Sequence, residues 1–338
     1  MRTVTELEQA LATPSQALVD DMRSMQGDLL LLGAGGKMGP SLAMLARNAL
    51  TAAGSGAAVI AVSRYSDPAV RRRLEEAGVT TVSADLLDEA DLAALPDAPN
   101  VIYMPAMKFG SSGQAPRTWA VNTYLAGRAA ARYAGSRIVA FSSGNVYPLV
   151  PVTSGGAREQ DPTGPVGEYA WSVLGRERLF EHFSLQNGTP VALLRLNYAV
   201  ELRYGVLVDI AVAVKSGEPI DVSMGNVNVV WQGDANEWTL RALGHCSSPA
   251  TVLNITGPET LSVRQLAERL GALLGVEPRF VGEEQPNALL NNASVAHSLF
   301  GYPRLGVQML LELVAAWVGS DGELLGRPTK FQVRSGAF

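Results

Sequence analysis

Apolar residues along this chain form two recurring patterns, short continuous runs and longer stretches with helical spacing. The runs have the length and composition of buried parallel strands, and they lie at residues 27–32, 57–63, 80–83, 101–104, 137–142 and 191–195. The stretches with helical spacing fall between them, at 40–46, 67–77, 88–95, 117–133 and 168–187. Strands that alternate with helices in this way predict an α/β fold with a doubly wound parallel sheet and right-handed crossovers.

The N-terminal end departs from that alternation. Residues 5–25 carry apolar positions at helical spacing, with a break at Thr13-Pro14-Ser15. We therefore expect residues 1–26 to be a helical extension that packs against the main domain.

The alternation also loosens beyond about residue 200, where Gly, Pro and Asn separate shorter elements. Helices are still predicted near 262–274, with Ser262 as the N-cap, and near 306–318. We expect a main domain at 27–195. A smaller lobe would occupy 196–338, with some of its elements returning to the main domain.

The first predicted strand runs into the segment GAGGKMG, and a helix follows directly. Its candidate cofactor-binding residues are Gly33, Gly35, Gly36, Lys37, Met38 and Gly39. The spacing G-x-x-G-x-x-G in this context predicts a tight turn whose backbone approaches a pyrophosphate at the helix N-terminus. The fold class is then Rossmann-type, with a dinucleotide in the main domain and a substrate in the smaller lobe. The alternative is a glycine turn without a ligand.

The end of the second strand bears on the choice of dinucleotide. NAD-binding versions usually place Asp or Glu there, whereas this strand ends in Ser63 and Arg64. An arginine can pair with a 2′-phosphate, so NADP is favoured and NAD stays possible. Alternatively, Arg64 stacks on the adenine or points to water. Asp85 and Leu86 follow the third strand near the expected adenine, although Asp85 could simply cap a helix.

Composition narrows the function classes. Among 338 residues the formal net charge is −5, and the basic residues form no extended cluster, so no nucleic-acid partner is expected. With one cysteine and three scattered histidines, the chain predicts no metal site and no intrachain disulfide, which favours a cytoplasmic location. No apolar run is long enough to span a bilayer, and no signal peptide is expected.

These motifs together resemble the extended short-chain dehydrogenase/reductases, also called NAD-dependent epimerase/dehydratases. The resemblance covers nearly the whole chain and includes the segments GAGGKMG, ADLLD, FSSGNVYP and NITGPETLSVRQLAERL. It implies that Ser143 hydrogen-bonds the substrate oxygen and that Tyr169 is the catalytic acid or base. It also implies that Pro105 and Ala106 lie beside the nicotinamide, and that Asn122 fixes backbone at the active site.

One position departs from the family pattern. The lysine expected four residues after the tyrosine, on the same helix face, is replaced by Val173. Without that charge the pKa of Tyr169 is expected near its reference value of about 10, which weakens proton abstraction more than proton donation. Lys108, in the loop after the fourth strand, is the proposed substitute and the third candidate catalytic residue. The alternative is a solvated loop lysine.

The substrate side carries amides and an aromatic ring. Candidate substrate-binding residues are Asn145, Asn197, Trp231 and Gln232. Such groups suit a polyhydroxylated ligand, so a sugar-like substrate is expected. The family's usual Gly-Pro after the Asn-x-Tyr segment is absent, so a free sugar or sugar acid is as plausible as a nucleotide sugar.

Two functions and one assembly follow from this sequence. The leading function is a nicotinamide-dependent oxidoreductase or epimerase/dehydratase, and the alternative is a dinucleotide-binding regulator or scaffold without catalysis. The resemblance also implies a homodimer formed by the helices at 117–133 and 168–187. Its contact residues would include Ala126, Ala129, Ala130, Phe180 and Phe183, unless these are buried within one subunit.

Overall fold

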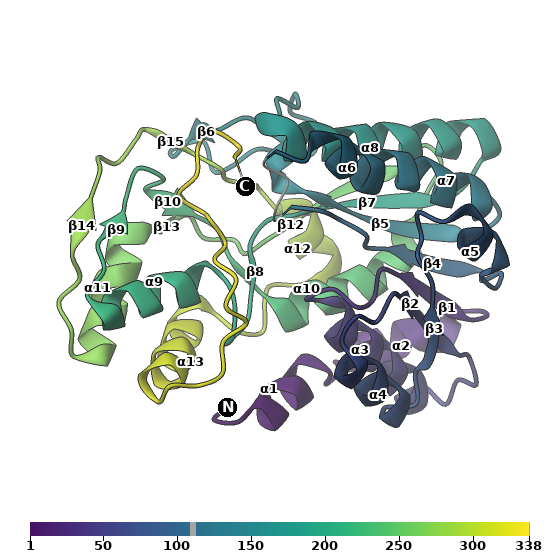
Figure 1. Cartoon of the computed structure of the whole chain (residues 1–338), viewed down its shortest axis with the longest axis horizontal. Coiled ribbons are helices and arrows are strands. Elements are labelled where there is room, and N and C mark those ends of the chain that lie inside the picture. The colour runs from purple at the N-terminus through teal and green to yellow at the C-terminus, as the bar shows by residue number, and fades with distance from the viewer. Residues whose placement is uncertain (109–112, 338) are drawn as a thin grey trace.

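The computed structural model describes residues 1–108 and 113–337, and its centre is a seven-stranded parallel sheet (Figure 1). The strands, in spatial order, are β12 (Thr251–Ile255), β7 (Val191–Leu196), β5 (Arg137–Ser143), β4 (Asn100–Tyr103), β1 (Leu29–Leu32), β2 (Val59–Ser63) and β3 (Thr80–Ser83). The register pairs Leu30 of β1 with Ile60 of β2 on one side and with Val101 of β4 on the other. The predicted Rossmann-type α/β fold is confirmed.

Helices cover both faces of the sheet, as its two-sided burial requires. One face carries α5 (Glu89–Ala94), α6 (Ala115–Trp119), α7 (Leu125–Arg132) and α8 (Gly167–Asn187). The other carries α2 (Gln16–Ser24), α3 (Gly39–Ala52), α4 (Pro68–Glu76), α10 (Gln232–Arg241) and α12 (Ser294–Phe300). Most bounds lie within two residues of the sequence prediction, but the helix expected at 117–133 contains a π-helical segment at Ala120–Tyr124.

Most of the residues expected at a dimer interface are instead buried on α7 and α8. Ala126, Ala129 and Ala130 of α7 and Phe180 of α8 lie in the core against the sheet, and Phe183 of α8 is partly buried beside them. The large hydrophobic residues exposed on this side of the molecule are Trp119 of α6, Tyr124 of the π-helical segment, and Trp171 and Leu185 of α8. The prediction is therefore wrong for the three alanines and Phe180, because the helix face that they occupy is the face needed to cover the sheet.

The N-terminal extension consists of α1 (Val4–Leu11) and α2, separated at residues 12–15 as the proline break predicts. Thr3 and Ser15 cap the two helices through their side-chain oxygens. Leu18 and Met22 of α2 enter the sheet core, whereas Leu7 and Leu11 of α1 enter the core of the second lobe. The extension therefore packs against both parts of the molecule.

The second lobe is built around α9 (Val206–Ser216), α11 (Val263–Leu274) and α13 (Val307–Gly319), which pack on one another. Ser262 caps α11 as predicted, through a hydrogen bond of 3.3 Å from Gln265 N. Four two-stranded pieces complete it: β6 (Val150–Pro151) with β15 (Asn287–Ala288), β8 (Ala199–Val200) with β11 (Val230–Trp231), β9 (Ile220–Asp221) with β14 (Phe280–Val281), and β10 (Asn226–Val227) with β13 (Leu261–Ser262).

After α13 the chain returns across the molecule as an extended segment, residues 320–337, which we call the C-terminal strap. Figure 1 shows it in yellow, running from α13 past the second lobe toward the start of α8. Phe331 anchors it in the core of the second lobe. Val333 packs against the cluster that contains Tyr169 and Val173. The strap thus connects the second lobe with α8.

Candidate functional site

The glycine turn lies where β1 ends and α3 begins, at the centre of the sheet. Gly33 has φ +84°, and a Cβ there would lie 2.9 Å from Pro105 N, so glycine is needed at this position. Around Gly36 the nearest atom to a Cβ would be Gly33 O at 3.6 Å, which leaves room on the ligand side. Helix α3 begins at Gly39 directly after the turn and has no side-chain cap hydrogen bond. These features fit a pyrophosphate.

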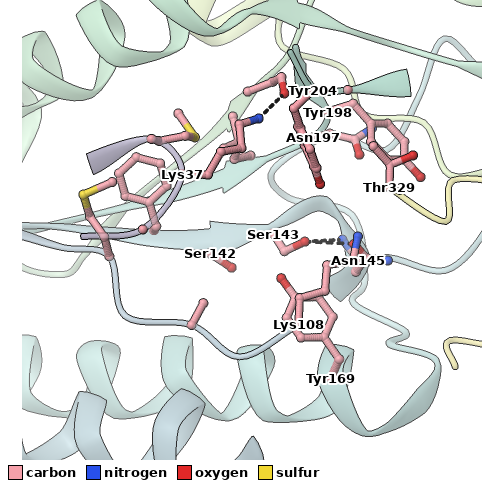
Figure 2. Close-up of a pocket in the computed structure, with 18 of the residues that line it drawn as sticks. Lys37, Lys108, Ser142, Ser143, Asn145, Tyr169, Asn197, Tyr198, Tyr204 and Thr329 are labelled. Atoms are coloured by element: carbon pink, nitrogen blue, oxygen red, sulfur yellow. Dashed lines mark hydrogen bonds between the residues drawn. The ribbon is translucent and has the colours of Figure 1, made fainter. Parts of the chain in front are cut away.

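A cavity of about 350 Å³ extends from this turn to α8 and to the second lobe (Figure 2). It opens at the carboxyl ends of β1 and β4, where strand order reverses and ligands of open α/β sheets bind. The sequence-predicted residues that line it are Gly33, Gly36, Lys37, Met38, Gly39, Ala106, Lys108, Ser143, Asn145, Tyr169 and Asn197. The structure therefore brings most of the predicted site into one space.

Ser143 and Tyr169 face each other across the floor of this cavity (Figure 2). Ser143 is the last residue of β5, and its Oγ lies 3.0 Å from Asn145 Oδ1. Tyr169 lies in the first turn of α8 and is 7% exposed. Burial raises the pKa of Tyr169 above 10, while a hydrogen bond with Ser143 and the charge of Arg176 partly oppose that rise. The expected pKa near the reference value was therefore too low.

The motif position Val173 belongs to an apolar cluster with Val146, Leu174 and Tyr169. The cation that sequence reasoning missed is Arg176, which lies one turn further along α8 and lines the cavity. It is 2% exposed. No sequence motif indicates Arg176, because the groups that accept its hydrogen bonds come from three separate segments of the chain.

The guanidinium of Arg176 is held by uncharged oxygens. Nε donates to Asn122 O at 3.0 Å, Nη1 to Phe141 O at 2.7 Å, and Nη2 to Pro105 O at 2.7 Å. Nη2 also lies 3.2 Å from Asn122 Oδ1. These bonds neutralise none of its charge, so Arg176 delivers a fixed positive charge next to Tyr169.

Lys108, the predicted substitute for the motif lysine, also lies beside Tyr169. Its Nζ lies 5.7 Å from the centroid of the Tyr169 ring, and its side chain lines the cavity. Burial, together with the nearby charge of Lys330, lowers the pKa of Lys108 to about 8. Lys108 is therefore beside the phenol ring, and Arg176 is a second cation, whose charge lowers the pKa of Tyr169.

Lys37 points from the glycine turn across the cavity to the second lobe. Its Nζ donates to Ala199 O at 3.0 Å and lies 3.8 Å from the centroid of the Tyr204 ring (Figure 2). Burial lowers the pKa of Lys37 to about 7, and the charge of Glu201 partly opposes this. An anion bound at the turn would raise that pKa again.

Asn122 lies beneath the cavity, fully buried, and does not line it. Its side-chain oxygen accepts from Met107 N at 2.8 Å, while its amide donates to Met107 O at 3.1 Å and to Ser172 Oγ at 2.9 Å. It therefore ties the loop after β4 to α8, which agrees with the backbone-fixing role implied by the resemblance. Pro105 is part of that loop and contacts Gly33.

The predicted adenine-side residues lie beyond the cavity. Ser63 Oγ packs against Gly35, where a Cβ would collide with it. Arg64 is exposed at the end of β2, and Leu86 is buried. Asp85 accepts from Leu87 N at 3.1 Å within the turn that precedes α5. The N-cap of α5 is Asp88, so Asp85 does not cap this helix.

Two of the four predicted substrate residues are elsewhere. Trp231 and Gln232 are 3% and 1% exposed and do not line the cavity. Gln232 Nε2 donates to Ser41 Oγ at 3.1 Å, at the packing of α10 on α3. The structure does not bring them to the cavity, because Trp231 is buried in the core of the second lobe and Gln232 is buried where α10 packs on α3. The residue that sequence reasoning missed instead is Thr329 of the C-terminal strap, which lines the cavity.

Residues 29–200 match the model of the NAD dependent epimerase/dehydratase family. None of the curated proteins matches the sequence significantly. Within the described residues no group of three or more His, Cys, Asp or Glu side chains could hold a metal ion. In the same part of the chain, no helix is long and apolar enough to cross a membrane.

Solved structures share the fold at low identity. MoeE5 in complex with UDP-glucose and NAD is 22% identical, with a TM-score of 0.70, over 87% of this chain and 99% of that one. UDP-glucose 4-epimerase from Thermotoga maritima is 17% identical, with a TM-score of 0.70 and the same coverage. UDP-glucuronic acid 4-epimerase from Bacillus cereus, in complex with NAD, is 17% identical, with a TM-score of 0.71, again over 87% and 99%.

Proposed function

Because this chain belongs to the NAD-dependent epimerase/dehydratase family, we propose that it transfers hydride between a nicotinamide dinucleotide and a carbinol or carbonyl carbon of a sugar-derived small molecule. The observation that carries the proposal is the meeting of the Ser143 and Tyr169 hydroxyls in a cavity that begins at the glycine turn. The structural neighbours bound to UDP-sugars support a sugar-like substrate.

The dinucleotide would lie along the turn at Gly33 and Gly36 and, when bound, would supply or accept the hydride. The Ser143 hydroxyl orients the substrate oxygen by a hydrogen bond. In the reductive direction Tyr169 donates its proton to that oxygen, which the neutral phenol can do. In the oxidative direction Tyr169 has to be deprotonated first, and its raised pKa makes that harder. At neutral pH Tyr169 is therefore in the protonated form, which reduction uses and oxidation cannot use directly.

The finer choices of cofactor and location are also proposals. NAD is the dinucleotide in the structural neighbours, whereas the exposed Arg64 at the end of β2 supports NADP for this chain. The single cysteine, Cys246, supports a cytoplasmic location, because it leaves no cysteine to form an intrachain disulfide.

A homodimer is proposed as well, through the outer face of α6 and α8 and the π-helical segment between α6 and α7. Trp119, Tyr124 and Trp171 are 38%, 60% and 52% exposed there. Aromatic side chains exposed on adjacent packed helices are typical of a surface that a partner covers.

The second candidate is a dinucleotide-binding protein without turnover. Val173 at the motif position and the raised pKa of Tyr169 favour it. Under this alternative the dinucleotide would still bind along the glycine turn, and Tyr169 would serve only as a buried phenol.

Substitution of Tyr169 by Phe separates the two functions. We expect dinucleotide affinity and melting temperature to persist while turnover falls by roughly 10²–10⁴-fold, the usual contribution of a positioned acid or base. Turnover would be found by screening sugars and sugar acids with both reduced and oxidised dinucleotides. The matched control is Tyr147→Phe, a buried phenol bonded to Arg195 and Asn254, which should lose stability and keep activity per folded molecule. Unchanged turnover in Tyr169→Phe would refute the enzymatic assignment of this residue.

A further inference from the structure

A second cavity, of about 490 Å³, also begins at the glycine turn and is lined by α3, α4 and the C-terminal strap. The residues of the turn and of the strap in its wall are Gly35, Gly36, Lys37, Glu323, Leu325 and Arg327. Four residues line both this cavity and the one beside Tyr169, and we call them the junction: Gly36, Lys37, Tyr204 and Arg327. The strap therefore passes the glycine turn at the place where the two cavities meet.

Contacts among the junction residues place a strap arginine near the expected phosphate site. Lys37 Nζ lies 3.8 Å from the centroid of the Tyr204 ring. Burial raises the pKa of Tyr204, and the charge of Arg327 partly opposes that rise, so the guanidinium acts on the same phenol. Gly36 is the turn residue that leaves room for a pyrophosphate, since a Cβ there would meet nothing nearer than 3.6 Å. Arg327 thus approaches this room from the strap.

Most other charges in the wall of the second cavity already have partners. Glu8 forms ion pairs with Arg73 and with Arg203. Asp67 caps α4 through its side chain. Glu323 is exposed on the strap. The ion pairs of Glu8 therefore leave the two cations of the junction for a ligand.

These two cations, Lys37 and Arg327, differ in how permanent their charge is. Lys37 donates to Ala199 O at 3.0 Å, and burial lowers its pKa to about 7, so it is only partly charged at neutral pH. An arginine stays charged over the whole physiological range. The guanidinium of Arg327 is exposed and forms no hydrogen bond or ion pair with the residues that the structure describes. Arg327 is therefore the permanent charge of the junction and is available to a ligand.

The strap is anchored on both sides of Arg327. Before it, Leu325 N donates to Arg203 O at 3.1 Å. After it, Thr329 N donates to Asp209 Oδ2 at 2.7 Å, and the Thr329 hydroxyl donates to the same oxygen. Because these bonds do not use the side chain of Arg327, they hold the residue at the junction and leave its guanidinium free to bind.

Resting on the function proposed above, we propose that the C-terminal strap completes the dinucleotide site and that Arg327 binds the diphosphate of the dinucleotide. The turn supplies the space at Gly36, and the strap supplies a charge-assisted contact from the opposite side. The bound dinucleotide then lies between turn and strap, so the strap has to open before it leaves. A nucleotide sugar offers the same diphosphate, but the position of Arg327 beside the glycine turn favours the dinucleotide.

The test compares ligands with and without the diphosphate. Calorimetric titrations of the wild type and of Arg327→Gln would use ADP-ribose and adenosine. We expect Arg327→Gln to bind ADP-ribose about tenfold or more weakly and adenosine with unchanged affinity, because adenosine carries no phosphate. Arg269→Gln is the charge-matched control, at an exposed arginine of α11 that bonds Gln308 and lines neither cavity. It should bind both ligands as the wild type does.

Three further ligands show which phosphate Arg327 contacts. NAD and NADP should lose affinity equally in Arg327→Gln, since both contain the diphosphate, and UDP-glucose should lose none. A loss confined to NADP would place Arg327 at the 2′-phosphate. A loss confined to UDP-glucose would place it at a substrate diphosphate. Either result, or unchanged affinity for ADP-ribose, would overturn the inference.

Hydrogen–deuterium exchange gives a second, independent readout. Saturating NAD should slow amide exchange both in the glycine turn and in residues 320–337 of the wild type, because the ligand contacts both segments. In Arg327→Gln saturated with NAD, the slowing should persist in the turn and be lost in the strap. Equal slowing of the strap in both proteins would contradict the contact. Failure of the proposed function would appear separately, as normal turnover in Tyr169→Phe with this binding pattern intact.

Discussion

Arg176 supplies positive charge to Tyr169 from two helical turns along α8. Side chains of a helix point back toward its N-terminus, so a long residue can act on a neighbour well before it in sequence. Val173, on the turn between them, packs in the apolar cluster instead. The charge is held by uncharged carbonyls, so a large part of its field stays available to the phenol.

Arg176 should therefore control the protonation of Tyr169. In Arg176→Gln the pKa of Tyr169 should rise further, so the pH profile of oxidation should move to higher pH while reduction changes less. Arg176→Lys keeps the charge and should restore the profile. Both variants leave carbonyls unpaired and should lose about 1–3 kcal/mol of folding stability. A stability loss with an unmoved pH profile would mean that Arg176 is only structural.

Arg64 should determine the choice of dinucleotide at the residue scale. If it pairs with the 2′-phosphate, NADP should bind about tenfold or more tightly than NAD, since a charge-assisted contact contributes roughly 1.5–3 kcal/mol. Arg64→Ala should abolish the difference. Arg23→Ala, an exposed arginine on α2, is the control and should not alter it. Calorimetry that shows NAD preferred by the wild type would contradict this assignment.

At the scale of elements, the glycines of the β1–α3 turn have separable functions. A Cβ at Gly39 would lie 2.6 Å from Ala34 Cα, so this glycine allows the turn to pack on the helix. At Gly36 a Cβ would meet nothing nearer than 3.6 Å. The protein tolerates the extra carbon at Gly36, but that carbon would fill the space that a pyrophosphate needs.

The two alanine substitutions should therefore fail in different ways. Gly36→Ala should keep its melting temperature and lose dinucleotide affinity, by at least tenfold in calorimetry. Gly39→Ala should lose stability, because backbone rather than a flexible side chain opposes the new carbon. If Gly36→Ala bound the dinucleotide normally, the turn would not be the pyrophosphate site.

At the scale of the whole molecule, the outer layer formed by α6 and α8 is the surface that should pair two chains. The inner faces of α7 and α8 cover the sheet, as the burial of Ala126 on α7 and Phe180 on α8 shows. The exposed aromatic side chains on the outer face are therefore available to contact a second copy of the chain.

Trp171→Glu should therefore convert a dimer to a monomer in sedimentation or light scattering, because a charge would be buried in the interface. The fold should persist, since Trp171 is 52% exposed in the single chain. Tyr302→Glu, at a residue 73% exposed after α12, is the matched control and should leave the mass unchanged. A wild-type monomer at micromolar concentration would contradict the proposed dimer.

The sequence by itself determined the features that depend on neighbours along the chain. Hydrophobic runs and helical spacing predicted the strands and helices, because each element buries one face or both. The glycine turn from Gly33 to Gly39 was also predictable, because its conformation depends on the glycines of the turn itself and on the strand and helix that flank it. Sequence motifs identified Ser143 and Tyr169 as site candidates at the end of a strand and the start of a helix. The fold brings both residues to the same cavity.

Only the tertiary structure decided which distant side chains share the cavity. Arg176 binds backbone from three segments, and Thr329 lies on the C-terminal strap, 160 residues after Tyr169 in sequence. The sequence pattern made Trp231 and Gln232 candidate ligand contacts, but Trp231 is buried in the core of the second lobe and Gln232 is buried where α10 packs on α3. Such assignments depend on how the two lobes and the strap pack, and the local pattern of hydrophobic and polar residues carries no record of that packing.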